Sequence, residues 1–318
     1  MRVCLFLLLL YFLPFRSSAQ IAYPFPGRSI TITIDDIDNK LAYMDVKADH
    51  PNGQTVVLLH GKNFTGLYWK NVIIALSRSG YRVIVPDQIG WGRSSKPNIK
   101  YSFEMLASTN RQLLDSLNID KAIVIGHSMG GMLAVRFALA YPERTSKLVL
   151  EDPLGLEDYK KFVPYKTMDQ QYRKELNATY TTYKKYQQSY YPLWKPSYEL
   201  YVQQQAEPLK QKDFNSVAYV NALTYQMIYE QPVFYELNRL TTPTLIIVGE
   251  LDRTIFGKDI LTAKQLKGHG NFPVLAKKAR ARIHNCKLVV LPGVGHIPHI
   301  ESNTLFDNTL VKFLNNSP

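Results

Sequence analysis

The chain of 318 residues has only two cysteines, Cys4 and Cys286, and Cys4 lies inside an apolar run at the amino terminus. If that run is removed on export, Cys286 is left alone. A disulfide within the mature chain is then excluded, and the fold must depend on its apolar core even in an oxidising compartment. A hydrophobic content of 46% is enough for one large α/β domain, or for a core domain with a smaller insertion.

Metal and cofactor signatures are also missing. The seven histidines show no ligand spacing such as H-x-x-x-H beside a carboxylate or cysteine partner. His296 and His299 are close in sequence, but other roles account for both. The segment GHSMGG at 126–131 lacks the G-x-G-x-x-G spacing of a nicotinamide or flavin fingerprint. We therefore expect no metal and no cofactor.

Acidic residues are scarce relative to basic ones. There are 38 Lys and Arg against 26 Asp and Glu, a formal charge of +12. No basic stretch carries the interleaved aromatics of a nucleic-acid module, so we expect no nucleic-acid partner. Residues 256–283 are strongly basic, with Asp259 as the single acid. A solvated helix face explains this segment best, and weak contact with an anionic surface is the alternative.

Residues 1–19 resemble a secretory signal peptide. Arg2 precedes an unbroken apolar run from Val3 to Leu13, and small residues at 17–19 suit cleavage before Gln20. The run is shorter than the roughly 20 residues that a membrane-spanning helix needs. We expect a periplasmic or secreted protein, with an uncleaved membrane anchor as the alternative.

Strands and helices alternate through most of the chain, which predicts a mostly parallel sheet covered by helices on both faces. Short apolar or alternating runs predict eight strands, at 30–34, 41–46, 55–59, 82–86, 122–125, 148–150, 244–248 and 287–291. Helical spacing is found at 69–76, 103–117, 132–140 and 301–314.

The alternation stops between residues 153 and 236. Of the 21 tyrosines in the chain, 14 lie in this segment, and two stripes of apolar residues at helical spacing run through it. We expect a helical cap inserted after the sixth strand, which divides the core into residues 20–152 and 237–318. Most of the tyrosines should pack on the core, while a few line a pocket between cap and core.

The turn after the fifth predicted strand carries the sequence G-x-S-x-G, centred on Ser128. Strand, tight turn and helix are the context of a nucleophile elbow, in which the serine adopts a strained backbone conformation. Gly126 and Gly130 leave room for that turn, and Gly131 is expected to let the helix approach the strand. The backbone N–H of Met129 can then face a developing oxyanion.

A serine hydroxyl needs a base, and the base needs a third group to fix its tautomer. All three must come from loops at the carboxyl ends of the strands. His296 follows the last predicted strand and Asp252 the one before it. Glu151 and Asp152 follow the strand before the cap and are alternative candidates for the acid.

These motifs together resemble the capped serine hydrolases of the α/β-hydrolase superfamily, over about residues 30–314. The matching pieces are HG at 60–61, DQIGWGRS at 87–94, GHSMGG at 126–131, GELD at 249–252 and GVGHIPHIE at 293–301. The resemblance implies the α/β-hydrolase fold and the order Ser128, Asp252, His296 for nucleophile, acid and base. It also implies that the N–H of Lys62 joins Met129 in the oxyanion hole, with Asn63 as the neighbouring alternative.

The other polar residues of these motifs are interpreted as structural. His127 should point away from the nucleophile, and His299 should begin a helix. His60 should shape the oxyanion loop, while Asp87 braces its turn. The side chain of Lys62 is expected to point to solvent.

The leading hypothesis is an exported serine hydrolase that cleaves a carboxylic ester or related acyl compound through an acyl-enzyme on Ser128. A carbon–carbon bond hydrolase or a perhydrolase with the same triad is an alternative. A catalytically silent protein that binds a small hydrophobic ligand under the cap is another, although such relatives usually lack a member of the triad.

Export should yield a mature chain that begins at Gln20, because small residues precede that position directly after the apolar run. Intact-mass measurement of protein recovered from the cell envelope or the medium checks this. A chain that retains Met1 would instead show an uncleaved anchor.

Overall fold

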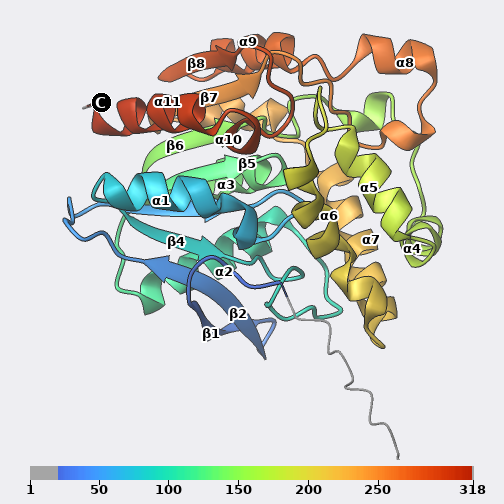
Figure 1. Cartoon of the computed structure of the whole chain (residues 1–318), viewed down its shortest axis with the longest axis horizontal. Helices are drawn as coiled ribbons and strands as arrows, with labels where there is room; N and C mark the ends of the chain where they lie inside the picture. The colour runs from blue at the N-terminus through green and yellow to red at the C-terminus, as the bar shows by residue number, and fades with distance from the viewer. Residues whose placement is uncertain (1–20, 317–318) are drawn as a thin grey trace, which may run out of the picture.

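The structure, a computed structural model, describes residues 21–316, so the expected signal peptide at 1–19 and Cys4 lie outside the described residues. Eight strands form one sheet in the order β1-β2-β4-β3-β5-β6-β7-β8 (Figure 1). β1 and β2 form an antiparallel hairpin, β2 is also antiparallel to β4, and every later pair is parallel. The strands are β1 (Gly27–Ile34), β2 (Ile37–Val46), β3 (Thr55–Leu59), β4 (Arg82–Pro86), β5 (Ala122–His127), β6 (Thr145–Glu151), β7 (Thr244–Gly249) and β8 (Cys286–Leu291).

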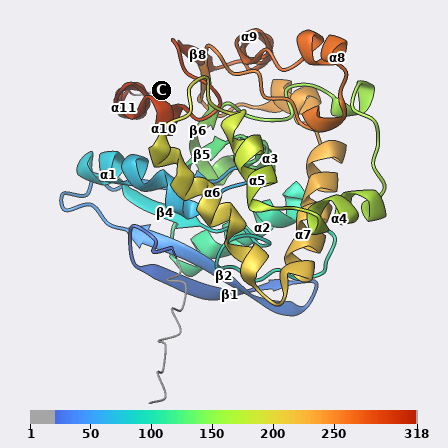
Figure 2. The same ribbon diagram turned by 45° about the vertical axis from the view of Figure 1, so that its right-hand side comes forward.

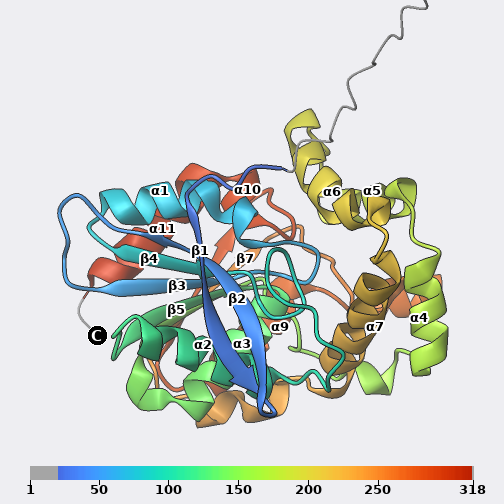
Figure 3. The same ribbon diagram turned by 90° about the horizontal axis from the view of Figure 1, so that it is seen from below.

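Helices cover both faces of this sheet. α1 (Lys70–Arg78) and α11 (Asn303–Asn315) pack on one face, while α2 (Phe103–Ser116), α3 (Met129–Ala140) and α9 (Phe272–Arg282) pack on the other (Figure 3). Each face of the sheet contributes one large cluster of buried apolar side chains. The central strands are buried on both sides, as their apolar sequences predict. The predicted α/β architecture is therefore confirmed.

Four α-helices lie between β6 and β7; they stand to one side of the sheet in Figure 1 and come forward in Figure 2. They are α4 (Met168–Leu176), α5 (Tyr180–Gln188), α6 (Glu199–Ala206) and α7 (Phe214–Glu230), with α4 packed against α7 and α5 against α6. One of the two stripes at helical spacing is divided between α4 and α5, because the Thr179 side chain accepts from Thr182 N and begins a new helix. The members of this stripe are Tyr165, Met168, Tyr172, Leu176, Tyr183 and Tyr190. Among residues 21–316, no helix combines the length and apolarity needed to cross a bilayer.

The turn between β5 and α3 holds Ser128 at φ 55° and ψ −118°, a strained conformation for a residue with a side chain. A Cβ on Gly126 would lie 2.1 Å from Gly130 O, and one on Gly130 would lie 2.1 Å from Leu59 O. These contacts agree with the expected need for glycine on both sides. Gly131 is required by a contact other than the expected one. A Cβ added at Gly131 would lie 2.6 Å from the Cβ of Pro153, which follows β6 in the chain.

Gly126→Ala should therefore destabilise the protein by about 3 kcal/mol, at the upper end of the range for overpacking. The backbone of α3 must move to admit the methyl group, since the atom in its way is a carbonyl oxygen. Gly268→Ala is the matched control: Gly268 ends α8 (Ala263–Gly268), and a Cβ there would meet nothing within 4 Å. Urea unfolding of the two variants checks this, and equal midpoints would contradict it.

Candidate active site

Ser128, His296 and Asp252 come together at the carboxyl ends of β5, β8 and β7. Ser128 Oγ lies 3.0 Å from His296 Nε2, and His296 Nδ1 lies 2.7 Å from Asp252 Oδ2. All three side chains are buried. Because a carboxylate accepts, Nδ1 carries the proton and Nε2 is free to accept from the serine hydroxyl. This is the arrangement in which a histidine can act as a general base.

Asp152 lies beside the triad rather than within it. Gly249 N donates to both carboxyl oxygens of Asp152 at 3.2 Å. Burial and the charge of Asp252 raise the pKa of Asp152 well above its usual range, so it is protonated and donates to Asp252. Burial alone would raise the pKa of Asp252. The charge of His296 and hydrogen bonds from His296, Asp152 and Thr254 N outweigh it and hold the pKa below its usual value.

Glu151, the other alternative acid, points to a different histidine. It accepts from His299 N at 2.8 Å and from His299 Nδ1 at 2.9 Å, where α10 (Pro298–Glu301) begins. Burial raises the pKa of Glu151 to about 7 and lowers that of His299 well below its usual value. Glu151 thus holds the start of α10, and the geometry favours Asp252 over both alternatives as the partner of His296.

The two expected oxyanion donors flank Ser128. Met129 is the first residue of α3, so its N–H has no partner within the helix. Among residues 21–316, the N–H of Lys62 likewise donates to no protein acceptor. His60 ties this loop down: Gln88 N donates to His60 Nε2 at 3.0 Å, so Nδ1 carries the proton and donates to Gly61 O at 2.9 Å.

Asp87 holds the neighbouring turn, as its position in the motif predicts. Its Oδ1 accepts from Gly66 N and its Oδ2 from Arg93 N, both at 2.9 Å. The Tyr23 hydroxyl donates to the same Oδ2. One carboxylate thus joins the amino-terminal segment to the loops that follow β3 and β4.

His127 points away from Ser128 and links two loops of the site. Its Nε2 donates to the carbonyl of His296 at 2.8 Å, so its Nδ1 accepts from Tyr68 OH at 3.0 Å. Tyr68 in turn accepts from Gly61 N at 2.9 Å. Burial lowers the pKa of His127 to about 3, so this chain stays neutral. The oxyanion loop and the histidine loop are therefore held in one network.

Tyr190 is a site residue that the sequence did not reveal. It lies just after α5, and its ring stacks on that of His296 with centroids 5.0 Å apart. Tyr190 O accepts from His296 N at 2.9 Å, and its hydroxyl accepts from Asn63 Nδ2 at 2.8 Å. The cap thus touches both the base and the oxyanion loop. Nothing in the sequence distinguishes Tyr190 from the other tyrosines around it.

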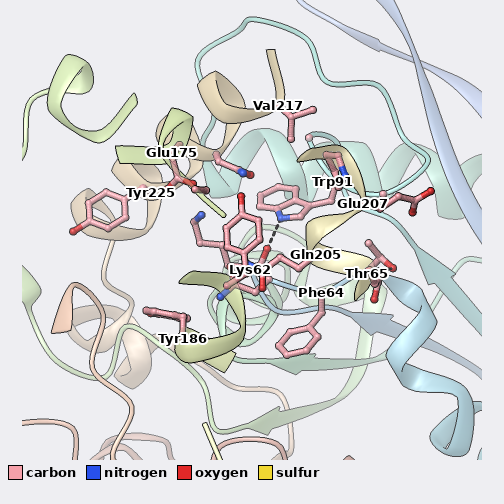
Figure 4. A pocket seen from close by; sticks show the side chains of 18 of the residues that line it. Lys62, Phe64, Thr65, Trp91, Glu175, Tyr186, Gln205, Glu207, Val217 and Tyr225 are labelled. Atoms are coloured by element: carbon pink, nitrogen blue, oxygen red, sulfur yellow. Dashed lines mark hydrogen bonds between the residues drawn. The ribbon is translucent and has the colours of Figure 1, made fainter. Parts of the chain in front are cut away.

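A cavity of about 470 Å³ lies between cap and core and reaches Ser128. Several cap tyrosines line it, as expected, among them Tyr183, Tyr186, Tyr190 and Tyr225. The expectation that the Lys62 side chain points to solvent is wrong, because Lys62 also lines this cavity (Figure 4). The cap covers the loop that carries Lys62. Trp91 Nε1 donates to Lys62 O at 2.6 Å, and this hydrogen bond holds the backbone of Lys62 in place beneath the cap.

Asp152, Asp252 and His296 also offer ligand atoms within 4.8 Å of one another, which is close enough to hold a metal ion. Asp252 and His296 are already joined by a hydrogen bond of the triad, and Asp152 donates to Asp252 from outside it. An ion there would displace the proton on His296 Nδ1 and that on Asp152. The donor set is therefore better explained by proton transfer than by metal binding.

Asp252→Asn should lower turnover by about 10⁴-fold, because an amide leaves the imidazole in the wrong tautomer and its cation uncompensated. Asp152→Asn should cost less than about tenfold, since an amide N–H can replace the carboxyl O–H that donates to Asp252. Glu151→Gln should act on stability more than on turnover. Steady-state kinetics at saturating substrate compare the three. A larger loss at Asp152 or Glu151 would move the triad acid to the end of β6.

Comparison with known proteins identifies the family. Residues 54–302 match the family described as alpha/beta hydrolase fold. A crystal structure of a probable hydrolytic enzyme from Pseudomonas aeruginosa PAO1 superposes with a TM-score of 0.91 and 43% identity, covering 93% of this chain and 96% of that one.

Two curated relatives match over shorter stretches. A 2-hydroxy-6-oxononadienedioate/2-hydroxy-6-oxononatrienedioate hydrolase of Paraburkholderia phymatum is 42% identical over 118 residues, 36% of this chain and 41% of that protein. A 2-hydroxy-6-oxo-6-phenylhexa-2,4-dienoate hydrolase of Burkholderia cepacia is 39% identical over 134 residues, 41% of this chain and 46% of that protein. The matched stretches thus span less than half of each relative. The family match over residues 54–302 and the fold it accompanies make this chain a member of the α/β-hydrolase family.

Proposed function

We propose that the protein is a serine hydrolase that cleaves a carboxylic ester or related acyl compound through an acyl-enzyme on Ser128. The observation that carries the proposal is the hydrogen-bonded chain from Ser128 Oγ through His296 to Asp252, which opens into the cavity under the cap. A purely structural serine would need neither the strained backbone nor the buried acid behind the histidine.

In this mechanism His296 Nε2 takes the proton of Ser128 as Oγ attacks the substrate carbonyl. The N–H groups of Met129 and Lys62 stabilise the negative charge that develops on the carbonyl oxygen. His296 then protonates the leaving group, and Asp252 stabilises the imidazolium in between. Water, deprotonated by the same histidine, attacks the acyl-enzyme and releases the acid.

Hydrolysis of a carbon–carbon bond next to a carbonyl is the second candidate. It is favoured by the names of the two curated relatives, which are hydrolases of 2-hydroxy-6-oxo-dienoate compounds. The same triad and oxyanion donors serve both reactions, so the substrate decides between them. The cavity that would make this choice is lined by residues of both cap and core.

We also propose that the protein is exported, because an apolar run followed by small residues begins the chain. Weak contact with an anionic surface is a further proposal. It rests on the exposed basic side chains of α9, which are Lys277, Lys278, Arg280 and Arg282.

Ser128→Ala should abolish hydrolysis and labelling by a fluorophosphonate probe while leaving the thermal unfolding midpoint nearly unchanged, because a hydroxyl is lost without a sizeable cavity. Ser116→Ala, at an exposed serine that ends α2, is the matched control and should label like the parent.

A panel of p-nitrophenyl esters of rising chain length, run beside a set of 2-hydroxy-6-oxo-dienoates, separates the two reactions. A parent protein that neither labels nor turns over any of these compounds would support the silent ligand binder instead.

A further inference from the structure

The cavity under the cap contains a cation without a counter-ion. Lys62 is half-buried, and among residues 21–316 no carboxylate lies within ion-pair distance of its ammonium group. Glu175 is the carboxylate whose charge acts most on Lys62, but Glu175 Oε1 accepts from Gln171 Nε2 at 2.7 Å instead. Burial lowers the pKa of Lys62, as expected for an ammonium removed from water.

The other basic side chains that line the cavity are satisfied by the protein. Lys174 pairs with Asp259 at 2.8 Å, and Lys96 donates to Gly92 O at 2.7 Å. Arg93 lies over the Tyr23 ring, 3.8 Å from its centroid. Lys62 differs from all three, because in the described part of the chain its ammonium group has no ion pair, hydrogen bond or cation–π contact, and only the more distant charge of Glu175 favours its charged form.

Three polar atoms of the cavity wall also lack a partner. They are Gln171 Oε1, Gln204 Oε1 and Tyr225 OH, on side chains that are 0%, 9% and 6% exposed. A buried polar group without a hydrogen bond is destabilising, so each such group in a native structure requires an explanation, of which a bound ligand or water is one. The two amide oxygens need a donor and the tyrosine hydroxyl can donate or accept, so these atoms suit a polar ligand, while the negative charge of that ligand is argued from Lys62 alone.

The position of Lys62 places its ammonium group near the bond that is expected to be cleaved. Its backbone N–H is one of the two expected oxyanion donors, and its carbonyl is fixed by Trp91 Nε1 (Figure 4). The ammonium therefore extends into the cavity from the residue that faces the substrate carbonyl. A charged group bound there would lie within one lysine side chain of the bond that is cleaved.

We infer that the substrate carries a carboxylate, that this carboxylate binds the ammonium group of Lys62, and that Lys62 thereby sets a preference for acid-bearing over neutral substrates. The inference rests on the proposed hydrolysis at Ser128 and names its substrate class. The charge is supplied by the ligand, which explains why the protein leaves Lys62 unpaired.

The test compares matched substrates. The p-nitrophenyl monoester of glutaric acid and p-nitrophenyl pentanoate have acyl chains of the same length, but only the first ends in a carboxylate. The pair para-acetoxybenzoate and phenyl acetate places the carboxylate on the leaving group instead. The parent protein should favour the acid-bearing member of at least one pair in kcat/KM, by about tenfold to a hundredfold for one charge-assisted contact. A preference for the neutral member in both pairs overturns the inference without any variant.

Lys62→Met should remove that preference, chiefly through a higher KM for the acid-bearing ester, because the contact is made in the ground state as well as in the transition state. Lys62→Arg keeps the charge and should keep the preference. Lys174→Met is the matched control: it removes a lysine of the same cavity that is paired within the protein, and it should leave the ratio of the two kcat/KM values within about twofold. A ratio unchanged in Lys62→Met overturns the inference.

Failure of the proposed function gives a different result. In that case the parent neither labels with the fluorophosphonate nor turns over either member of a pair. If the parent labels and hydrolyses the neutral ester without favouring its acid-bearing partner, the reaction stands and the Lys62 inference alone is wrong.

Discussion

The strained backbone at Ser128 is the constraint on which the rest of the site depends. A residue at φ 55° and ψ −118° persists only if its surroundings over-determine it. Here Ser128 N donates to Glu151 O at 3.0 Å, and Ser128 O accepts from Gly131 N at 2.9 Å and from Leu154 N at 3.1 Å. The elbow is thus bound to β6, to its own helix and to the first residues of the cap.

The same contacts tie the cap to the candidate active site. Leu154 and Tyr190 lie at opposite ends of its first half, and they hold the nucleophile turn and the base respectively. A rigid outward movement of the cap would break the bond from His296 N to Tyr190 O. The contact between Tyr190 and His296 therefore restrains the cap relative to the histidine loop.

The sequence predicted the sheet, and it predicted that Ser128, Asp252 and His296 lie at one edge of it, because both leave local signals. Each strand is a short run of apolar or alternating residues, and Ser128, Asp252 and His296 each follow such a run in a recognisable turn. It did not predict α6, in which glutamines dominate and no apolar stripe stands out. It also missed Tyr190 and misjudged Lys62, because both roles come from contacts between cap and core that no local pattern encodes.

The charges around the triad follow from burial. His127 is held neutral by desolvation, and Asp152 stays protonated beside Asp252, so the carboxylate that His296 needs lies next to groups that add no competing charge. A buried site organised in this way would not retain a half-buried lysine without reason, since desolvation disfavours an unpaired ammonium. Among the described residues, Lys62 is the basic side chain of the cavity wall whose charged group has no ion pair, hydrogen bond or cation–π contact, and it lines the cavity into which Ser128 opens. That contrast is why its charge is better understood as part of substrate recognition than as part of the fold.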